Sequence, residues 1–414
     1  MSTSETTAAD GTSLPGAHPQ RWAYGLLLVL LGLALGVSAL PSPLYPIYQA
    51  EWGLTPLTTT VVFAVYAIGA LGAALTVGPV SDAVGRKPVL IAAVLAITVG
   101  MAVFLGATTE WQLLIARFLH GAAIGSITVV AGAALLDVRP HDGPANGMRA
   151  GVALNVGIAV TVLGAAAAAQ WAPAPLRTPF AAVELVVLAI LAAVLVLVEP
   201  HTGRTGGRVR FRPPTVPRVI SRDFWFSGIG ILAAWSVLGV FLSLYPALAE
   251  HATGVDSAMF TGAVVATMAG SAALAQWIGG RYSPLPTAIV GDAGMIVSLA
   301  LAVVAVHVGS AAFVIADAAL LGVTFGLAFG GSLRHLTSVA PDDARGQVMS
   351  AFYLLGYLAM GIPTVIAGYL STTFSTAAVF PWFAAAVGIG CLVAGLLGAR
   401  SLTRTGADSA SRPR

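Results

Sequence analysis

The residues of this chain that could do chemistry are a few ionisable side chains within long apolar stretches. Arg117 is the basic one, and the acids are Glu184, Asp292 and Asp317. A charge in a membrane interior is costly and usually faces a cavity or a partner. A carboxyl group in such a place can exchange a proton, whereas arginine keeps its charge. We predict that Arg117, Asp317 and Glu184 line a proton pathway and that Asp292 is structural; the alternative is that these charges only hold helices together.

Other kinds of chemistry lack the residues that they need. The sequence has no phosphate-binding glycine loop, no His or Cys spacing typical of metal sites, and no motif for nucleophilic catalysis. Its single cysteine, Cys391, excludes an intramolecular disulfide. The basic residues are scattered among loops, a pattern that favours membrane topology over nucleic-acid binding. We therefore expect no enzyme activity, no cofactor, no metal and no nucleic-acid partner.

The elements that must position these residues are membrane helices. Hydrophobic residues make up 57% of the 414 residues and charged residues only 9%, whereas soluble proteins carry about 25% charged residues. A membrane-spanning helix needs about 20 apolar residues, and the apolar runs here are too long for strands. The predicted helices are 22–45, 57–78, 88–107, 111–136, 147–170, 177–198, 223–249, 258–279, 284–307, 311–333, 345–370 and 376–399. The fold class is therefore an all-α membrane protein with twelve transmembrane helices.

The basic residues lie almost all on one side of these predicted helices. Apart from Arg117 and Arg177, every lysine and arginine falls in a tail or in a loop on the side of Gly85. By the positive-inside rule this side is cytoplasmic and holds both termini. The predicted divisions are a disordered cytoplasmic tail (1–21), two six-helix bundles (22–199 and 223–399), an arginine-rich cytoplasmic linker (200–222) and a cytoplasmic C-terminal tail (400–414). The linker is read as a topology anchor, with a lipid head-group site as the alternative.

The two halves of the chain resemble each other. Leu44-Tyr45-Pro46 ends the first predicted helix, and Leu244-Tyr245-Pro246 ends the seventh. At the same sequence offset, Arg117 in the fourth helix corresponds to Asp317 in the tenth. A nearly constant offset across separate regions indicates duplicated halves. We therefore expect Arg117 and Asp317 to occupy matching places in the two bundles.

A short polar stretch, GPVSDAVGRKP, separates the second and third predicted helices. It resembles the signature G-x-L-a-D-r-x-G-r-k between helices 2 and 3 of the major facilitator superfamily. The matching positions are Gly78, Asp82, Gly85, Arg86 and Lys87, and the departures are Val80 and Ala83. The resemblance implies that Asp82 faces the start of helix 11 and that the basic residues pair across the cytoplasmic seam. Asp137, at the end of the fourth helix, is a candidate partner for Arg86.

The polar stretch is expected to act as a gate. Asp82 is predicted to lie just beyond the second helix, near the start of the third, where the helix dipole favours an acid. Gly78 and Gly85 would allow close approach and a tight turn. The alternative is an anchor that sets topology and has no part in gating. The second half has Gly280-Arg281-Tyr282 in the corresponding place, without the acid, and this predicts a weaker gate there.

Arg117-Phe-Leu-His120-Gly121-Ala-Ala-Ile-Gly125 resembles the helix 4 pattern R-x-x-x-G-x-x-x-G of the same superfamily, with His120 where glutamine is common. In that family the arginine is often linked to proton transfer, and helices 1, 4, 7 and 10 line the cavity. The resemblance therefore implies that Arg117 and Asp317 both face it. The other residues expected around the cavity are Tyr45, Asn155, Trp235, Tyr245 and Gln276. They indicate an amphipathic pocket, although each alone is more often a packing residue.

The resemblance covers roughly residues 22–400 and implies a secondary transporter that works by alternating access. We expect a monomer in the lipid bilayer of a bacterial inner membrane that exports small amphipathic molecules in exchange for protons. Helix 5 lacks the G-P-x-x-G-G run of drug/proton antiporters, and Pro363 lies in helix 11 instead. The alternatives are a proton-coupled metabolite importer and, in another class, a non-transporting membrane receptor.

Overall fold

The computed structural model describes residues 21–201, 213–341 and 344–410. Most of the predicted N-terminal tail (1–20), the centre of the linker (202–212) and the end of the C-terminal tail (411–414) lie outside the described residues. Twelve spans in the described part are long and apolar enough to cross a membrane. The helices are α1 (Arg21–Ala39), α2 (Tyr45–Trp52), α3 (Pro56–Val84), α4 (Arg86–Leu105), α5 (Glu110–Val138), α6 (Gly143–Trp171), α7 (Thr178–Val196), α8 (Ser221–Ser243), α9 (Tyr245–Thr253), α10 (Ala258–Gly279), α11 (Pro284–Val308), α12 (Ala311–Val339), α13 (Arg345–Phe374) and α14 (Thr376–Ala410). The predicted all-helical membrane fold is confirmed.

The first and seventh predicted helices are each divided in two. Pro41 and Pro43 lie between α1 and α2, and a proline lacks the N–H that would continue a helix. In the second half, α8 and α9 are divided at Leu244. Each short helix ends at a glycine with φ of 67°, Gly53 and Gly254 respectively. The Leu-Tyr-Pro motifs therefore introduce short helices, whereas the sequence predicted that they end long ones.

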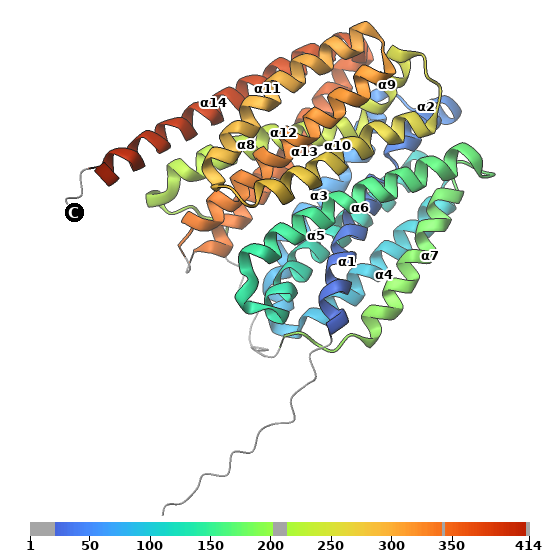
Figure 1. Ribbon diagram of the computed structural model, residues 1–414. Helices are drawn as coiled ribbons and strands as arrows, with labels where there is room; N and C mark the ends of the chain where they lie inside the picture. The colour runs from blue at the N-terminus through green and yellow to red at the C-terminus, as the bar shows by residue number, and fades with distance from the viewer. Residues whose placement is uncertain (1–20, 202–212, 342–343, 411–414) are drawn as a thin grey trace, which may run out of the picture.

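Two other helix ends differ from the prediction. The α3 helix continues through the polar stretch to Val84, so Asp82 lies in its last turn and not beyond it. The α14 helix continues to Ala410, past the predicted end at residue 399, and Figure 1 shows it extending beyond the other helices. Hydropathy marks where a chain leaves the bilayer, but backbone hydrogen bonds continue a helix into water. Between the halves, α7 ends at Val196 and α8 begins at Ser221.

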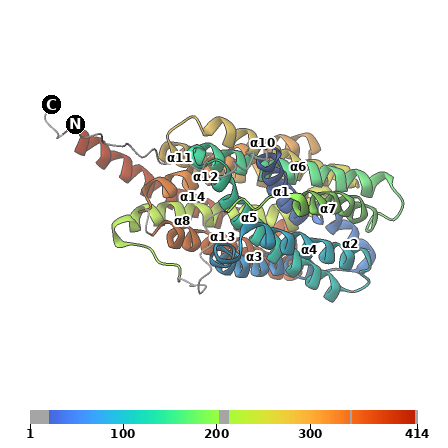
Figure 2. The same cartoon turned by 90° about the horizontal axis from the view of Figure 1, so that it is seen from below.

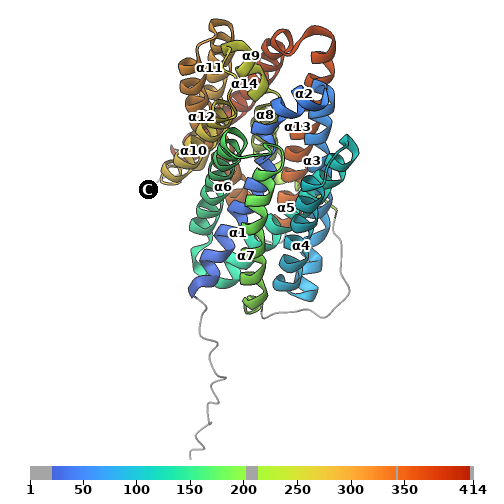
Figure 3. The ribbon, with the colours of Figure 1, turned by 90° about the vertical axis from the view of Figure 1, so that its right-hand side faces the viewer.

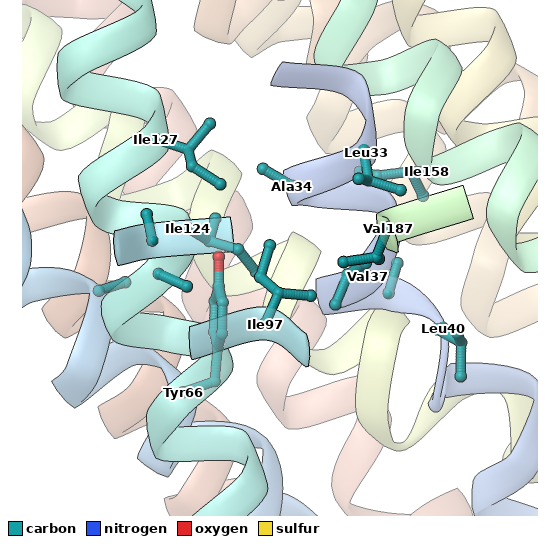
Figure 4. Close-up of a cluster of buried hydrophobic side chains, with 14 of the residues drawn as sticks. Leu33, Ala34, Val37, Leu40, Tyr66, Ile97, Ile124, Ile127, Ile158 and Val187 are labelled. Atoms are coloured by element: carbon teal, nitrogen blue, oxygen red, sulfur yellow. The ribbon is translucent and has the colours of Figure 1, made fainter. Parts of the chain in front are cut away.

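The helices form two bundles, α1–α7 and α8–α14, which lie side by side (Figures 1 and 2). Figure 4 shows the core of the first bundle, where Val37 of α1, Ile97 of α4 and Ile124 of α5 meet. All three side chains are fully buried. The outer faces carry large exposed apolar side chains such as Val160 and Leu185. The outer surface is therefore as apolar as the core, as a lipid environment requires.

Glycines bring the helices of each bundle into close contact. A Cβ placed on Gly121 of α5 would collide with the Tyr66 carbonyl of α3. In the second bundle, a Cβ on Gly322 of α12 would collide with the Met268 carbonyl of α10. Small residues permit such approach where no hydrophobic force drives helices together in lipid. The α3–α5 and α10–α12 pairs therefore have the same packing, which supports duplicated halves.

This shared packing fixes the register of the repeat more firmly than the sequence does. Gly121 of α5 and Gly322 of α12 occupy the same place in the two bundles. Arg117 precedes the first glycine by four residues, and the residue that precedes the second by four is Ala318. The structural counterpart of Arg117 is therefore Ala318, and Asp317 lies one residue before it in the chain, whereas the sequence offset had paired Arg117 with Asp317. A one-residue shift turns a side chain by about 100° around a helix.

The two bundles meet along two seams, α6 against α10 and α3 against α13 (Figure 3). On the first seam, Gly280 meets the Met148 sulfur near the end that holds Arg86, and Gly262 meets Ala166 near the other end. The first seam is therefore closed along its length. Glycines allow the contact at both ends: Gly280 receives the Met148 side chain, and Gly262 receives the Ala166 methyl group.

The α3–α13 seam is closed at the end away from Arg86. Gly368 of α13 lies against Thr60, close to the start of α3. About two turns nearer the middle, a Cβ on Gly361 would lie 3.8 and 3.9 Å from Ala67 and Ala64. Toward the other end of α3, Gly78 has only ordinary contact, with Val129 at 3.8 Å. Gly78 therefore does not bring α3 close to another helix.

Candidate functional site

The polar stretch folds around the Arg86 side chain. Gly85 has φ of 107°, a conformation that other residues rarely adopt, and it separates α3 from α4. The Arg86 guanidinium then folds back and donates to Ser81 Oγ at 2.6 Å and to Asp82 Oδ1 at 2.5 Å. Its Nε donates to Asp137 Oδ2, at the end of α5, at 3.0 Å. One nearly buried cation therefore holds the adjoining ends of α3, α4 and α5 together.

Glu199 is a member of this cluster that the sequence reasoning missed. Its two carboxylate oxygens accept hydrogen bonds from the backbone N–H groups of Arg86 at 2.8 Å and Lys87 at 3.1 Å. These are the first N–H groups of α4, which have no partner within the helix. The acid that the α4 dipole favours is therefore Glu199, and not Asp82 as predicted. An acid directly after a membrane helix on the side of the polar stretch was the available signal.

His201 extends the cluster after α7. Its backbone N–H donates to Glu199 Oε1 at 3.1 Å, and its Nδ1 lies 3.4 Å from Asp137 Oδ2. Asp137 thus joins α5 to both Arg86 and the segment that follows α7. Asp82, in contrast, has a side chain that is 54% exposed. We refer to Asp82, Arg86, Asp137, Glu199 and His201 as the Arg86 cluster.

Replacing Glu199 with alanine is expected to destabilise the Arg86 cluster. The loss of a helix cap costs about 0.5–2 kcal/mol, and here two α4 N–H groups lose their acceptor. The thermal midpoint of the purified protein should fall by a few degrees. Glu110→Ala is the matched control, because Glu110 is an exposed acid in the first turn of α5. An equal fall in both variants would contradict the capping role.

The second bundle holds the corresponding turn in another way. Arg334 of α12 donates to the carbonyl oxygens of Gly279 at 2.8 Å and Tyr282 at 3.0 Å, where α10 turns into α11. Arginine here satisfies the last carbonyl groups of a helix, as cations near helix C-termini do. The two bundles therefore hold this turn differently: the first uses ion pairs and the second uses backbone carbonyl groups.

Arg117 lies inside the first bundle, with a side chain that is fully buried. Its Nη1 donates to the Ser38 carbonyl at the end of α1 at 2.7 Å, and its Nε donates to the Val62 carbonyl of α3 at 3.4 Å. The guanidinium carbon lies 5.5 and 4.9 Å from the ring centres of Phe63 and Tyr66. No carboxylate pairs with it among the described residues. Its charge is therefore stabilised by carbonyl dipoles and aromatic faces.

Asp317 lies in the second bundle and does not contact Arg117. Its side chain is 2% exposed, and neither carboxyl oxygen has a hydrogen-bond partner in the described part of the chain. It lies near Tyr245, whose ring stacks on Phe241 at 4.0 Å. In the first bundle, Tyr45 lies near Arg117 in the same manner. The structure therefore gives each charge a tyrosine neighbour from its own bundle.

Two further candidates, His120 and Glu184, lie between helices of the first bundle. His120 fits against Gly100 of α4, and its ring centre lies 5.3 Å from that of Phe104. Glu184 on α7 is half-buried and interacts with Thr98 of α4. Asn155 on α6 donates to the carbonyl group of its own helix at 3.0 Å. The structure therefore brings neither His120 nor Glu184 to the seams between the bundles.

An aromatic cluster lies where the bundles meet. The ring centre of Trp235 on α8 lies 5.0 Å from that of Tyr357 and 6.2 Å from that of Tyr353, both on α13. Tyr357 also reaches the first bundle, where it lies near Thr128 of α5 and Tyr66 of α3. Of this cluster, only Trp235 was predicted from the sequence. A pair of tyrosines one helical turn apart in the eleventh span was the available signal.

The described residues hold no group of three or more His, Cys, Asp or Glu side chains that could bind a metal ion. The buried carboxyl groups can exchange protons, and the Arg117 guanidinium holds a fixed charge. Aromatic and hydroxyl contacts are available where the bundles meet. Such a set of contacts can bind a small molecule.

The sequence model of the Major Facilitator Superfamily matches residues 26–364, most of the chain. The chain belongs to the Major Facilitator Superfamily. Multidrug resistance protein MdtL of Shewanella oneidensis is 26% identical over 349 residues, which are 81% of this chain and 83% of MdtL. The family consists of transporters, so this protein is a multi-pass membrane transporter.

Two other relatives in the superfamily match over shorter stretches. Inner membrane transport protein YnfM of Escherichia coli is 32% identical over 114 residues, 27% of each chain. Multidrug resistance protein MdtM of Salmonella typhimurium is 36% identical over 83 residues, 20% of this chain and 19% of MdtM. The chain thus matches about a quarter or less of the length of these two relatives.

The fold also agrees with a solved structure of the superfamily. The human organic anion transporter MFSD10 (TETRAN) superposes with a TM-score of 0.67, over 92% of this chain and 99% of MFSD10. The sequences are 16% identical, so the similarity concerns the fold. The predicted major facilitator fold, with two pseudo-symmetric six-helix bundles, is confirmed.

Proposed function

We propose that this member of the superfamily is a proton-coupled exporter of small amphipathic compounds, working by alternating access. The observation that carries this proposal is the aromatic cluster of Trp235, Tyr353 and Tyr357 between the bundles. Aromatic faces bind apolar rings and cations without demanding one fixed shape. Relatives named multidrug resistance proteins support a substrate class of this kind.

Alternating access would use the two seams in different ways. The α6–α10 seam, close along its whole length, would act as the axis. The α3–α13 seam, closed by Thr60 and Gly368 at the end away from Arg86, would open and close. We take this arrangement as the state that is open toward the Arg86 side. Opening the far end requires Gly368 to move away from Thr60, and the Arg86 side would then close.

The Arg86 cluster is proposed to act as the gate on its side. Arg86 holds Asp137 and Asp82 within one bundle, and the exposed Asp82 carboxylate is free to meet the second bundle when that side closes. Asp317 is proposed as the proton carrier, because its carboxyl oxygens have no partner in the described structure. Arg117 would supply a fixed positive charge in the other bundle.

The proposal is tested by flux in proteoliposomes of known orientation. An imposed pH gradient should drive a fluorescent aromatic cation against its concentration gradient, from the Arg86 side to the other side. Trp235→Ala and Tyr357→Ala should lower this flux at least tenfold at unchanged abundance. Trp225→Ala is the control, because Trp225 is an exposed tryptophan on the same helix. Accumulation in the reverse direction would instead identify an importer, and no flux for any aromatic probe would contradict the proposed substrate class.

The proposed orientation places both termini and the Arg86 side in the cytoplasm of a bacterial cell. In a Cys391→Ala background, Thr108→Cys should react with an impermeant thiol reagent in intact cells, because Thr108 is exposed between α4 and α5. Gly207→Cys, in the linker, should react only after the cells are opened. Labelling of the linker from outside would reverse every inside and outside assignment.

A further inference from the structure

A buried carboxyl group in the second bundle has no role in the proposed transport. Asp292 on α11 is 0% exposed, and neither carboxyl oxygen has a hydrogen-bond partner among the described residues. Taking a carboxylate out of water without compensation costs several kcal/mol. Asp292 therefore needs a positive charge that the surrounding side chains do not supply.

Two fully buried serine hydroxyl groups, on α12 and α8, are also without partners. Ser332 on α12 and Ser227 on α8 are 0% exposed, and the described residues provide no hydrogen bond to either Oγ. Other buried helical serines, such as Ser243 and Ser298, donate to the carbonyl oxygen four residues earlier. Their hydroxyl groups are satisfied locally, whereas those of Ser227 and Ser332 are available to another group.

Gly230 is the point at which these groups come together. A Cβ placed on Gly230 would lie 2.9 Å from Ser332 Oγ and 3.7 and 3.9 Å from the two Asp292 carboxyl oxygens. Ser227 precedes Gly230 by three residues and therefore lies on the same face of α8. Asp292 and Ser332 thus direct unpartnered oxygen atoms at Gly230, and Ser227 lies one turn away on the same face of α8. The missing side chain of Gly230 leaves space between the three helices.

We propose that Asp292, Ser332 and Ser227 form a binding site for one monovalent cation, a proton or Na⁺, inside the second bundle. Hard cations take oxygen ligands, and one positive charge neutralises one carboxylate, whereas a divalent ion would leave a buried excess charge. The site lies apart from the proposed proton carrier, because Ser332 follows Asp317 on α12 by roughly 22 Å of helix. Its existence does not depend on the proposed transport function.

Few titratable groups surround this site. The Cys391 thiol of α14 is close enough to feel the charge of Asp292. His335 of α12 pairs with Asp223 of α8 at 2.9 Å, one helical turn beyond Ser332. Arg334 donates to carbonyl groups at the α10–α11 turn and has no ion pair with Asp292. None of these side chains neutralises the Asp292 carboxylate. The neutralising cation therefore has to be bound from solution.

The thermal midpoint of the full-length protein in detergent tests the site, measured from pH 6 to 9 in NaCl or in choline chloride at equal ionic strength. If Na⁺ is bound, the midpoint at pH 8–9 should be about 3 °C or more higher in NaCl, and the difference should shrink at pH 6 as protons compete. If only a proton is bound, NaCl should have no effect, and the midpoint should fall as the pH rises. In both cases Asp292→Asn should remove the dependence.

Two further variants keep the test decisive if Asp292→Asn does not fold. Ser332→Ala and Gly230→Ala both retain the carboxyl group, and each should reduce the response to Na⁺ or pH by half or more. Ser298→Ala is the control, because it removes a buried hydroxyl group from α11 that is already bonded to Gly294. The proposal is overturned if Ser332→Ala and Gly230→Ala respond as the unsubstituted protein does, or if Asp292→Asn retains the full dependence.

Discussion

Replacing Arg117 with methionine is expected to abolish proton-driven transport and to lower the thermal midpoint by several degrees. Methionine fills a similar volume, but the Ser38 carbonyl loses the donor that lies 2.7 Å away. A buried acceptor left without a partner costs about 1–3 kcal/mol, and the contact with the Tyr66 ring at 4.9 Å is lost as well. Flux in proteoliposomes and thermal unfolding of the purified variant measure the two effects separately.

Two further variants separate the role of the charge at position 117 from that of packing. Arg117→Lys keeps the charge but cannot reach both the Ser38 and Val62 carbonyl groups with a planar fork, so stability should recover in part and transport should not. Arg139→Met is the matched control, because Arg139 also lies over a tyrosine ring, at 4.0 Å from Tyr24, but is 46% exposed. Wild-type flux in Arg117→Met would exclude any part for Arg117 in coupling.

Asp317→Asn is expected to abolish accumulation driven by a pH gradient while substrate still equilibrates down its own gradient. Asparagine has the same size as aspartate but cannot bind and release the proton that Asp317 is proposed to carry. Stability should change little or rise, because the buried carboxyl group has no partner in the described structure that asparagine would lose. If the variant still pumps, Asp317 is not the carrier, and Glu184→Gln becomes the next variant to measure.

The structure also changes what a double variant should show. The family resemblance implied that Arg117 and Asp317 face the same cavity, and two charges that met there would give coupled stability losses. In the structure Arg117 is bound by Ser38 and Val62, and Asp317 lies beside Tyr245, so they share no partner. The changes in unfolding free energy should therefore add to within about 0.5 kcal/mol. A larger interaction energy in a double-mutant cycle would show that the two side chains do meet in another state.

Several features of this protein follow from its sequence alone. The twelve spans follow from apolar runs, because the bilayer thickness sets the length of a membrane helix. The duplicated halves follow from the repeated Leu-Tyr-Pro motifs, and the family from the residues around Asp82 and Arg86. The turn at Gly85 also follows, because few other residues adopt its φ of 107°. In each case the cause acts within a short stretch of chain.

Other features were decided only by the tertiary structure. Glu199 was not expected to cap α4, since it lies far from Arg86 in the sequence and meets it only when α7 packs against α4. Helix packing also decides that Tyr357 lies between the bundles. It likewise sets the register in which Ala318 is the counterpart of Arg117 in the second bundle. In a soluble protein, polar and apolar faces would orient each helix. In a membrane, lipid and core are equally apolar, so the faces that meet are chosen by close contacts such as that of Gly121 with Tyr66, which only the folded chain reveals.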